Sequence, residues 1–426
     1  MAYRDFVAHV HGGQVLLDDS GSLPSITGED PNETPLRDRL ELVGADFPIG
    51  PMDRLGEDVF VTTVEVCDGT VPDGRWTDLD TLSDPPGLEG VAEAVRRCVE
   101  EYAGTAPPHR PDWYRPGWFP DVEAWIEEAL GRVGRSRTGP LVAVQLWSLS
   151  AVLRVPTDRG VAWFKATCEH FHGEPAIHRV LADHFPDFVP VLIAEDDDRA
   201  WLLMEPLRGA TDQAEGAASA LATAYPRVQL ASLEVLDELR AAGCSDRGLQ
   251  ANLEGWRQVL ADSVELPLLT AEEVAAVRAV GEEVEALVEE FWACGLPDTL
   301  CHGDLHIGNV AYDGSELRVF DWSDSCLSHP FLDGGHLLHF GAAAGSGPTA
   351  EVDTQVADRF AEPWRSAFPQ ADVDRALALA PLADRVFQAV SYEGIYRATE
   401  ERSLWELRGI TAKLLRRLPE SLPEFR

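Results

Sequence analysis

The residues best suited to chemistry lie in one stretch, LCHGDLHIGNVAYDGSELRVFDWSD, at positions 300–324. It contains the tripeptide His-Gly-Asp at 302–304, then Asn309, then Asp321. The segments NVAY and ELRVFDW predict two short strands, and the Asp-Gly pair at 313–314 is a strong signal for a β-hairpin between them. Because a hairpin would return Asp321 to the neighbourhood of Asn309, we expect a carboxylate, an amide oxygen and a second carboxylate to converge.

This set of groups is the one that phosphoryl transfer requires. A carboxylate must position the attacking hydroxyl and accept its proton, and the nucleoside triphosphate needs Mg²⁺ held by hard oxygen ligands. We therefore assign Asp304 as the catalytic base and Asn309 and Asp321 as the Mg²⁺ ligands. The alternative interpretation is that these residues form ordinary surface turns rich in Asp and Gly. This alternative is the weaker one, because so many residues of the required types lie together in one short stretch.

The stretch resembles the catalytic loop of the aminoglycoside phosphotransferase and choline kinase family, which reads His-Gly-Asp, a variable residue, His or Asn, two more residues and Asn. The matching positions are His302, Gly303, Asp304, His306 and Asn309, followed by Asp321. The resemblance covers about residues 140–400 and implies an ATP-dependent, Mg²⁺-requiring kinase of small molecules. It also implies that His302 and His306 support the loop, and that Asp333 anchors the catalytic segment.

The resemblance assigns a nucleotide site as well. Lys165, in the predicted strand VAWFKAT, corresponds to the lysine that contacts the α- and β-phosphates, and Glu174, which opens the predicted helix EPAIHRVLADHF, to its ion-pair partner. Glu169 is the alternative candidate for the ion-pair partner of Lys165. A serine-containing loop replaces the glycine-rich loop of protein kinases, which favours a small-molecule acceptor over a protein. The other residues expected to bind nucleotide are Ser148 and Ser150 in this loop, and Met204, Glu205 and Leu207 in the hinge.

The order of predicted elements indicates an α+β chain with a protein-kinase-like two-lobed fold and an additional N-terminal α/β domain. The expected parts are an N-terminal domain at 1–104, a Pro/aromatic linker and helix at 105–139, a β-rich small lobe at 140–207 and a helical large lobe at 208–426. Five prolines between 105 and 120 restrict the chain there, and we expect the neighbouring aromatics to pack it onto an adjacent domain. Asp121 is predicted to cap the helix that follows.

The first hundred residues predict strands at DFVAHV, QVLLDD and DVFVTTVEV, with a His-Gly-Gly turn between the first two. GLEGVAEAVRRCVEEYAG predicts an amphipathic helix. This order resembles a Nudix domain. Such an enzyme needs a helix with clustered glutamates to hold Mg²⁺, and the corresponding stretch, PLRDRLELVG, has only Glu41. We expect a degenerate, structural version of that unit.

Composition restricts the partners of the chain. Its 73 acidic and 35 basic residues give a net charge of −38, which disfavours nucleic acid and anionic membrane surfaces. The seven cysteines include no CxxC pair, and no segment predicts a signal peptide or a membrane span, so we expect a cytoplasmic protein. Lysine occurs only at positions 165 and 413, an arginine bias typical of GC-rich genomes such as those of actinobacteria.

Two functions from different classes fit these patterns. The first is a small-molecule O-phosphotransferase, and the second is a non-catalytic kinase-like module that binds nucleotide or acts as a scaffold. Intact catalytic positions favour the enzyme. For the acceptor, Asp324 and Glu393 are candidate substrate ligands, since carboxylates would favour an amino sugar or an aminoglycoside. The alternative is that both are solvated charges in an acidic chain.

Overall fold

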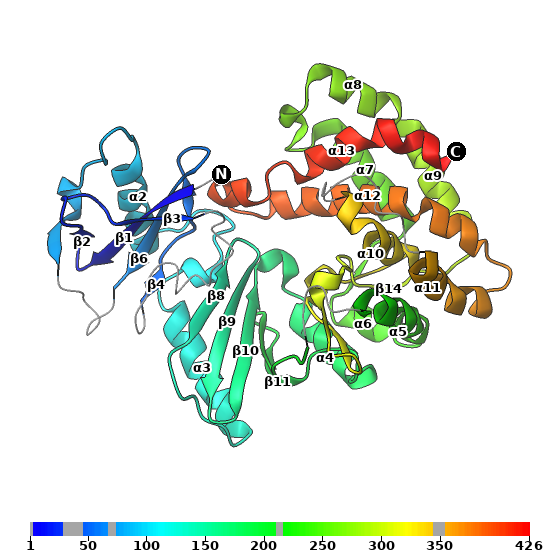
Figure 1. The fold of residues 1–426 in the computed structure, drawn as a ribbon, viewed down its shortest axis with the longest axis horizontal. Coiled ribbons are helices and arrows are strands. Elements are labelled where there is room, and N and C mark those ends of the chain that lie inside the picture. The colour runs from blue at the N-terminus through cyan, green and yellow to red at the C-terminus, as the bar shows by residue number, and fades with distance from the viewer. Residues whose placement is uncertain (1–2, 29–45, 67–73, 210–215, 344–353) are drawn as a thin grey trace. The chain divides into compact units, whose positions relative to one another are not determined.

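The computed structural model describes residues 3–28, 46–66, 74–209, 216–343 and 354–426 (Figure 1). Contacts between Cα atoms divide the chain into two compact units. Unit 1 consists of Met1–His170, Ile193–Pro206 and Ala398–Leu407, and unit 2 of Phe171–Leu192, Leu207–Arg397 and Arg408–Arg426. Unit 1 thus holds both the N-terminal segment and the strands beyond residue 140. The domain boundary expected at residue 104 stays a prediction.

The N-terminal part of unit 1 is a seven-stranded sheet. Its strands are β1 (Tyr3–His11), β2 (Gln14–Leu17), β3 (Ser25–Gly28), β4 (Phe47–Pro48), β5 (Asp53–Arg54), β6 (Val59–Glu65) and β7 (Arg75–Asp78). The order is β4-β6-β1-β2-β7, with β3 on β1 and β5 on β6, and β1 runs parallel to β6. The predicted turn is confirmed, since Gly12 and Gly13 adopt the positive φ angles that it needs.

Helix α2 (Val91–Ala103) packs against this sheet and confirms the predicted amphipathic helix. Val91, Val95 and Cys98 are buried together with Phe6 and Val15 in one hydrophobic cluster. Removing such side chains from water is the main favourable term in folding. The stretch PLRDRLELVG, on which the comparison with Nudix enzymes depends, lies outside the described residues.

The linker is held by its aromatic residues, as predicted. Trp113 and Tyr114, in the short helix η2 (Asp112–Tyr114), are buried and donate hydrogen bonds to the carbonyls of Trp147 and Leu146 at 3.0 and 3.2 Å. Helix α3 (Trp118–Arg132) then starts at Trp118 with Gly117 as N-cap. The predicted cap at Asp121 is wrong, because Asp121 lies in the first turn and Gly117 supplies the left-handed conformation that starts the helix.

A five-stranded antiparallel sheet completes the β-rich part of unit 1. Its order is β11-β12-β10-β9-β8, formed by β8 (Val142–Leu146), β9 (Ser150–Thr157), β10 (Gly160–Thr167), β11 (Leu192–Asp196) and β12 (Trp201–Met204). Helix α3 lies along this sheet in Figure 1, and Trp118 and Trp125 contact Phe164 and Trp201 edge to face. These large rings form the core between helix and sheet.

A segment close to the C-terminus also belongs to unit 1. Residues 398–407 include the short helix η7 (Glu401–Glu406), and buried ion pairs tie them to the N-terminal part. Arg110, whose side chain is fully buried, donates to Glu400 and Glu101. Arg402 pairs with Asp53 at 3.1 Å and with Glu101. These long-range contacts join three distant parts of the sequence.

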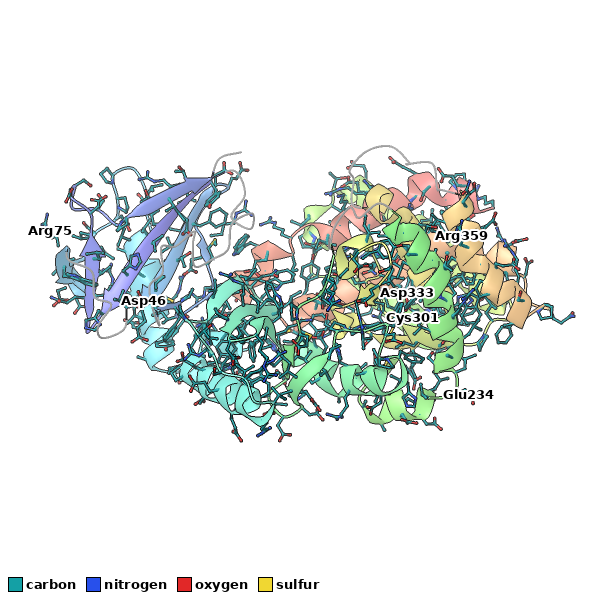
Figure 2. All side chains as sticks on the ribbon, turned by 60° about the horizontal axis from the view of Figure 1, so that its bottom comes forward. Asp46, Arg75, Glu234, Cys301, Asp333 and Arg359 are labelled. Carbon is teal, nitrogen blue, oxygen red and sulfur yellow. The ribbon has the colours of Figure 1, made fainter. Side chains whose placement is uncertain are left out.

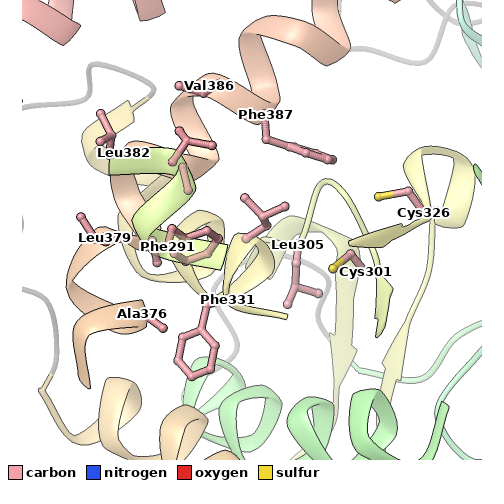
Figure 3. Close-up of a cluster of buried hydrophobic side chains, with 14 of the residues drawn as sticks. Phe291, Cys301, Leu305, Cys326, Phe331, Ala376, Leu379, Leu382, Val386 and Phe387 are labelled. Atoms are coloured by element: carbon pink, nitrogen blue, oxygen red, sulfur yellow. The ribbon is translucent and has the colours of Figure 1, made fainter. Parts of the chain in front are cut away.

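Unit 2 is mainly helical. It contains α4 (Glu174–His184), α5 (Ala217–Ser232), α6 (Leu236–Ala241), α7 (Leu249–Asp262), α8 (Ala271–Ala279), α9 (Gly281–Ala293), α10 (Phe331–Ala343), α11 (Thr354–Ala367), α12 (Val373–Arg397) and α13 (Ile410–Ser421). Its hydrophobic core gathers around α12, where Leu379, Leu382 and Phe387 pack with Phe291 and Phe331 (Figure 3). Within the described residues no helix is long and apolar enough to cross a membrane.

Short strands interrupt the helices and carry the predicted motif. One small sheet has the order β13-β17-β14, formed by β13 (Ser245–Asp246), β17 (Cys326–Ser328) and β14 (Thr299–Cys301). The predicted hairpin is present as β15 (Val310–Tyr312) paired antiparallel with β16 (Leu317–Val319), and Val310 lies opposite Val319. Asp313 stabilises its turn, since Oδ1 accepts hydrogen bonds from the amides of Ser315 and Glu316.

Candidate active site

The catalytic segment starts where β14 leaves the core of unit 2. All three residues of β14 are buried, and Leu305, which follows Asp304, is buried in the same hydrophobic cluster (Figure 3). Gly303 has a φ of 84°, and a Cβ atom there would lie 2.3 Å from the carbonyl oxygen of Asp324. Only glycine fits both the left-handed backbone and the close approach.

His302 supports the loop from within. Its Nε2 lies 3.0 Å from the carbonyl oxygen of Phe320 and donates to it, while Nδ1 accepts from the amide of Asp304 at 3.4 Å. One ring nitrogen therefore donates and the other accepts, as in a neutral imidazole. Burial lowers the pKa of His302, which favours the same neutral form. The ring thus connects Asp304 to Phe320, the residue that precedes Asp321.

Asp333, in the first turn of α10, holds the same loop through its backbone. Its Oδ2 accepts from the amide of His302 at 2.7 Å and from the hydroxyl of Tyr225, and Oδ1 accepts from the amide of Gly303 at 3.0 Å. Figure 2 shows Asp333 beside Cys301, the last residue of β14. Burial raises the pKa of Asp333, and these hydrogen bonds compensate for the loss of water.

Asp304 is partly exposed, with 36% of its side chain accessible to solvent. Its Oδ1 is 3.1 Å from Nε2 of His336, and its Oδ2 is 3.5 Å from Nε2 of His306 and 3.3 Å from Nδ2 of Asn309. Burial raises its pKa, but hydrogen bonds from His306 and His336 outweigh burial and leave the pKa well below its usual range. The carboxylate is therefore ionised at neutral pH.

The hairpin brings Asn309 close to Asp321. The amide of Phe320 donates to the carbonyl of Asn309 at 3.0 Å, one residue before Asp321. Asp321 has a φ of 64°, an uncommon conformation for a residue with a side chain, and its Oδ1 accepts from Ser323 at 2.7 Å. His306 caps the turn that precedes Asn309, since its Nδ1 accepts from the amide of Gly308 at 3.0 Å.

The side chain of Asn309 is held by the loop through its amide nitrogen. Its Nδ2 donates to the carbonyl oxygen of Asp304 at 3.0 Å, so this contact does not use Oδ1. Within the described part of the chain Oδ1 has no hydrogen-bond partner. An amide oxygen and the nearby carboxylate of Asp321 are hard donors of the kind that Mg²⁺ takes. These two residues fit a magnesium ion.

The sequence did not single out His336, which lies on α10 one turn after Asp333. Its Nδ1 is 3.1 Å from Oδ1 of Asp384 on α12. Gln388, one turn further along α12, donates to the carbonyl of Gly303 at 2.7 Å. The sequence could have indicated His336, because it follows Asp333 by three residues and a helix places two such side chains on the same face. Asp384 and Gln388 had no such signal, since only the packing of α10 on α12 brings them here.

The residues assigned to the nucleotide are divided between the units. Lys165 lies on β10 in unit 1, opposite Val152 on β9 and Leu202 on β12, and it is buried. Glu174 is the first residue of α4, as predicted, and it is buried too. Helix α4 belongs to unit 2. The assignment of these two side chains as partners stays a prediction.

The serine loop connects β8 and β9. The amide of Ser148 donates to Glu406 at 2.9 Å, and Ser150 accepts from the indole nitrogen of Trp147 at 2.8 Å. Burial raises the pKa of Glu406 to about 7, although the hydrogen bonds with Ser148 oppose this shift. The amide of Ser148 is therefore engaged with a carboxyl group of the protein, and the assignment of Ser148 and Ser150 to the nucleotide stays a prediction.

The hinge follows β12. Met204 is the last residue of that strand, opposite Trp163, and Glu205 forms an ion pair with Arg135 at 2.8 Å. Leu207 begins the segment that belongs to unit 2. The side chain of Glu205 is thus engaged with Arg135, so that main-chain groups are what this stretch offers to a nucleotide base.

The two candidate substrate ligands lie in different surroundings. Glu393, on α12, is buried, pairs with Arg397 at 2.8 Å and accepts from the amide of Val264 at 3.3 Å. Asp324 follows Asp321 by three residues and remains partly exposed. Burial raises the pKa of Tyr392, and the charges of Asp304 and Asp324 raise it further, so Tyr392 lies near both carboxylates. The assignment of either residue to the substrate stays a prediction.

The sequence of residues 132–369, more than half of the chain, matches the phosphotransferase enzyme family. The chain belongs to this family. It is a kinase of small molecules, and its catalytic segment, 300–324, lies entirely within the matching range. The family also accounts for the division into a β-rich and a helical part.

The chain is similar to several solved structures, one of which reaches a TM-score of 0.50 and shows a similar fold. Aminoglycoside 2'-phosphotransferase-IIIa in its GDP complex is 14% identical, with a TM-score of 0.50, and the alignment covers 71% of this phosphotransferase and 99% of that chain. A macrolide 2'-phosphotransferase type I is 15% identical over 69% and 97% of the two chains, with a TM-score of 0.44. A choline/ethanolamine kinase family protein from Mesorhizobium loti is 16% identical over 72% and 97%, with a TM-score of 0.46. No curated protein gives a significant sequence match.

Proposed function

We propose that this phosphotransferase transfers the γ-phosphoryl group of ATP, with Mg²⁺, to a hydroxyl group of a small molecule. One observation carries the proposal: the carboxylate of Asp304 remains partly exposed while its loop is fixed from behind by His302 and Asp333. A rigid loop that presents one ionised carboxylate is what positioning an attacking hydroxyl requires.

In the proposed reaction, Asp304 accepts a hydrogen bond from the acceptor hydroxyl and orients its oxygen. That oxygen forms a bond to the γ-phosphorus as the bond between this phosphorus and the β,γ-bridging oxygen breaks. ADP leaves, and the hydroxyl proton passes to Asp304 and then to solvent. Because the transition state of phosphoryl transfer is loose, orientation contributes more than the basicity of the carboxylate.

Asn309 and Asp321 would hold Mg²⁺, which neutralises charge on the phosphate oxygens when it is bound. Lys165 would contact the α- and β-phosphates, with Glu174 as its partner. The amides and hydroxyls of Ser148 and Ser150 would cover the phosphates. The base would pair with main-chain groups at Met204, Glu205 and Leu207.

For the acceptor we propose a compound that carries an ammonium group, such as an amino sugar or an aminoglycoside. Asp324 supports this class, because its carboxylate is partly exposed and its charge acts on Tyr392 together with that of Asp304. A charge-assisted hydrogen bond to an ammonium group would contribute both affinity and orientation. Glu393, already paired with Arg397, would act at most through its neighbours.

The alternative raised by the sequence is a non-catalytic nucleotide-binding module, and membership of the phosphotransferase family argues against it. The residues that such modules lose are all present: Lys165, Glu174, Asp304, Asn309 and Asp321. The two candidates differ in one observable, since a module would bind nucleotide without releasing ADP.

The test is an ADP-release screen with ATP and Mg²⁺ over aminoglycosides, amino sugars, neutral sugars, choline and homoserine. We expect release above the solvent background with at least one amine-bearing acceptor, and a phosphorylated product of matching mass. Asp324→Asn should raise KM for that acceptor more than it lowers kcat. ATP binding without ADP release for every acceptor would support the module instead, and equal or better kcat/KM for a neutral analogue would reject the ammonium group.

A further inference from the structure

His336 lies between two carboxylates inside unit 2. Its Nε2 is 3.1 Å from Oδ1 of Asp304, and its Nδ1 is 3.1 Å from Oδ1 of Asp384. A neutral imidazole carries one N–H and no charge, whereas an imidazolium carries an N–H on each nitrogen and can form an ion pair with both carboxylates. Burial lowers the pKa of His336, but the charge of Asp384 and the hydrogen bonds with Asp304 and Asp384 outweigh burial and raise it to about 10.

Among the described residues, charged and titratable groups of the catalytic loop and of α12 face His336. Asp304 and His306 come from the catalytic loop, where the rings of His306 and His336 are 6.3 Å apart. Asp384 comes from α12 and is itself buried. His336 thus lies between the buried carboxylate of Asp384 and the partly exposed carboxylate of Asp304.

The packing of the helices fixes the imidazole in place. Only 5% of His336 is exposed. Its neighbour Gly335 approaches α12 so closely that a Cβ atom would lie 2.5 Å from the carbonyl oxygen of Ala380. The Nε2 atom of Gln388 lies 3.4 Å from Nδ1 of His336 while it donates to the carbonyl of Gly303. The imidazole and the catalytic loop are therefore parts of one connected assembly.

We infer that His336 is a positioning residue for phosphoryl transfer: oriented by Asp384, it holds Oδ1 of Asp304, while Asn309 holds Oδ2. The inference rests on the proposed function, since it takes Asp304 as the group that receives the acceptor hydroxyl. Contacts on both oxygens determine the plane of the carboxylate. A misplacement of about 1 Å in a reacting group can lower the rate on the order of 10²-fold.

The charge of His336 has a second consequence. A cation beside Oδ1 stabilises the ionised form of Asp304, so that the carboxylate is ready to accept a hydrogen bond from the acceptor hydroxyl. His336 keeps its own proton throughout, and the hydroxyl proton goes to Asp304. If the role of His336 were purely structural, its charge would only neutralise the buried carboxylate of Asp384 and would not affect Asp304.

The experiment compares His336→Gln, which keeps an N–H donor without the charge, with His336→Leu, which removes both. We expect kcat to fall on the order of 10-fold for the first and 10²-fold for the second, with KM for ATP nearly unchanged. The exposed His172 gives the matched control, His172→Gln, with unchanged kinetics. Asp384→Asn keeps an acceptor for Nδ1 and should retain more activity than Asp384→Ala. Thermal melting identifies variants that fail to fold.

A double-mutant cycle separates the two roles. If His336 acts through Asp304, His336→Gln should have no further effect on kcat in the Asp304→Asn background. Independent, multiplicative effects would overturn the inference, as would His336→Gln with kcat within twofold of the wild type. A wild-type protein that releases no ADP with any acceptor would reject the proposed function itself.

A readout independent of activity uses ¹⁵N-labelled histidine. The His336 signal, identified by its absence in His336→Gln, should remain that of an imidazolium at pH 8, and Asp384→Asn should bring its titration toward neutral pH. A neutral imidazole at pH 8 in the wild type would overturn the charged arrangement.

Discussion

Gly303→Ala is the substitution whose effect follows most directly from the geometry. An alanine at a φ of 84° costs about 1–2 kcal/mol through contact of its own Cβ with the backbone. That Cβ would also lie 2.3 Å from the carbonyl oxygen of Asp324, so the two segments must separate by about 1 Å. The neighbouring residue is Asp304, and such a shift in a reacting group lowers the rate on the order of 10²-fold. We expect a loss of both stability and turnover.

Gly243→Ala provides the control that separates these two effects. Gly243 also has a positive φ, 95°, but nothing lies within 4 Å of the position of its Cβ. It should lose about 1–2 kcal/mol of unfolding free energy and keep its kcat. Urea denaturation and steady-state ADP release measure both quantities. If Gly303→Ala kept a kcat within twofold of the control, the argument that Gly303 fixes Asp304 would fail.

Three further predictions concern other parts of the chain. Lys165→Met should raise KM for ATP, Glu174→Gln should do so more mildly, and additive effects in a double-mutant cycle would exclude an ion pair between them. Because the pKa of Glu406 is raised to about 7, the free energy of unfolding should fall as the pH rises from 4.5 through 7. Glu406→Gln should remove this contribution, and an equal pH dependence in the variant would contradict the raised pKa. Glu400→Gln, which leaves the buried Arg110 without its closest carboxylate, should cost about 3–5 kcal/mol in urea denaturation, and a loss below about 1 kcal/mol would contradict a buried ion pair there.

Local patterns in the sequence predicted the hairpin and the neighbourhood of Asn309 and Asp321. Both depend on short separations along the chain, where an Asp-Gly turn and two strands are sufficient. The amphipathic helix α2 and the strand that carries Lys165 were predicted for the same reason. The start of α3 was missed, because the left-handed conformation of Gly117 started the helix before the Asp121 that looked like a cap.

The surroundings of the base could not be read from the sequence. Asp384 is 80 residues from Asp304, and only the close packing of α10 on α12 brings it to His336. Residues 398–407 belong to unit 1 although they are distant from it in the sequence, and the ion pair between Arg402 and Asp53 is one contact that joins them. Ion pairs of this kind leave no periodic signal in the sequence.

The most direct test is to measure both the turnover of Asp304→Asn and its affinity for nucleotide. The amide keeps the size of the side chain but removes the proton acceptor and the charge beside His336. We expect kcat to fall on the order of 10²-fold or more, with affinity for Mg²⁺–ATP within about threefold of the wild type. Full turnover in Asp304→Asn would contradict the assignment of Asp304 as the catalytic base.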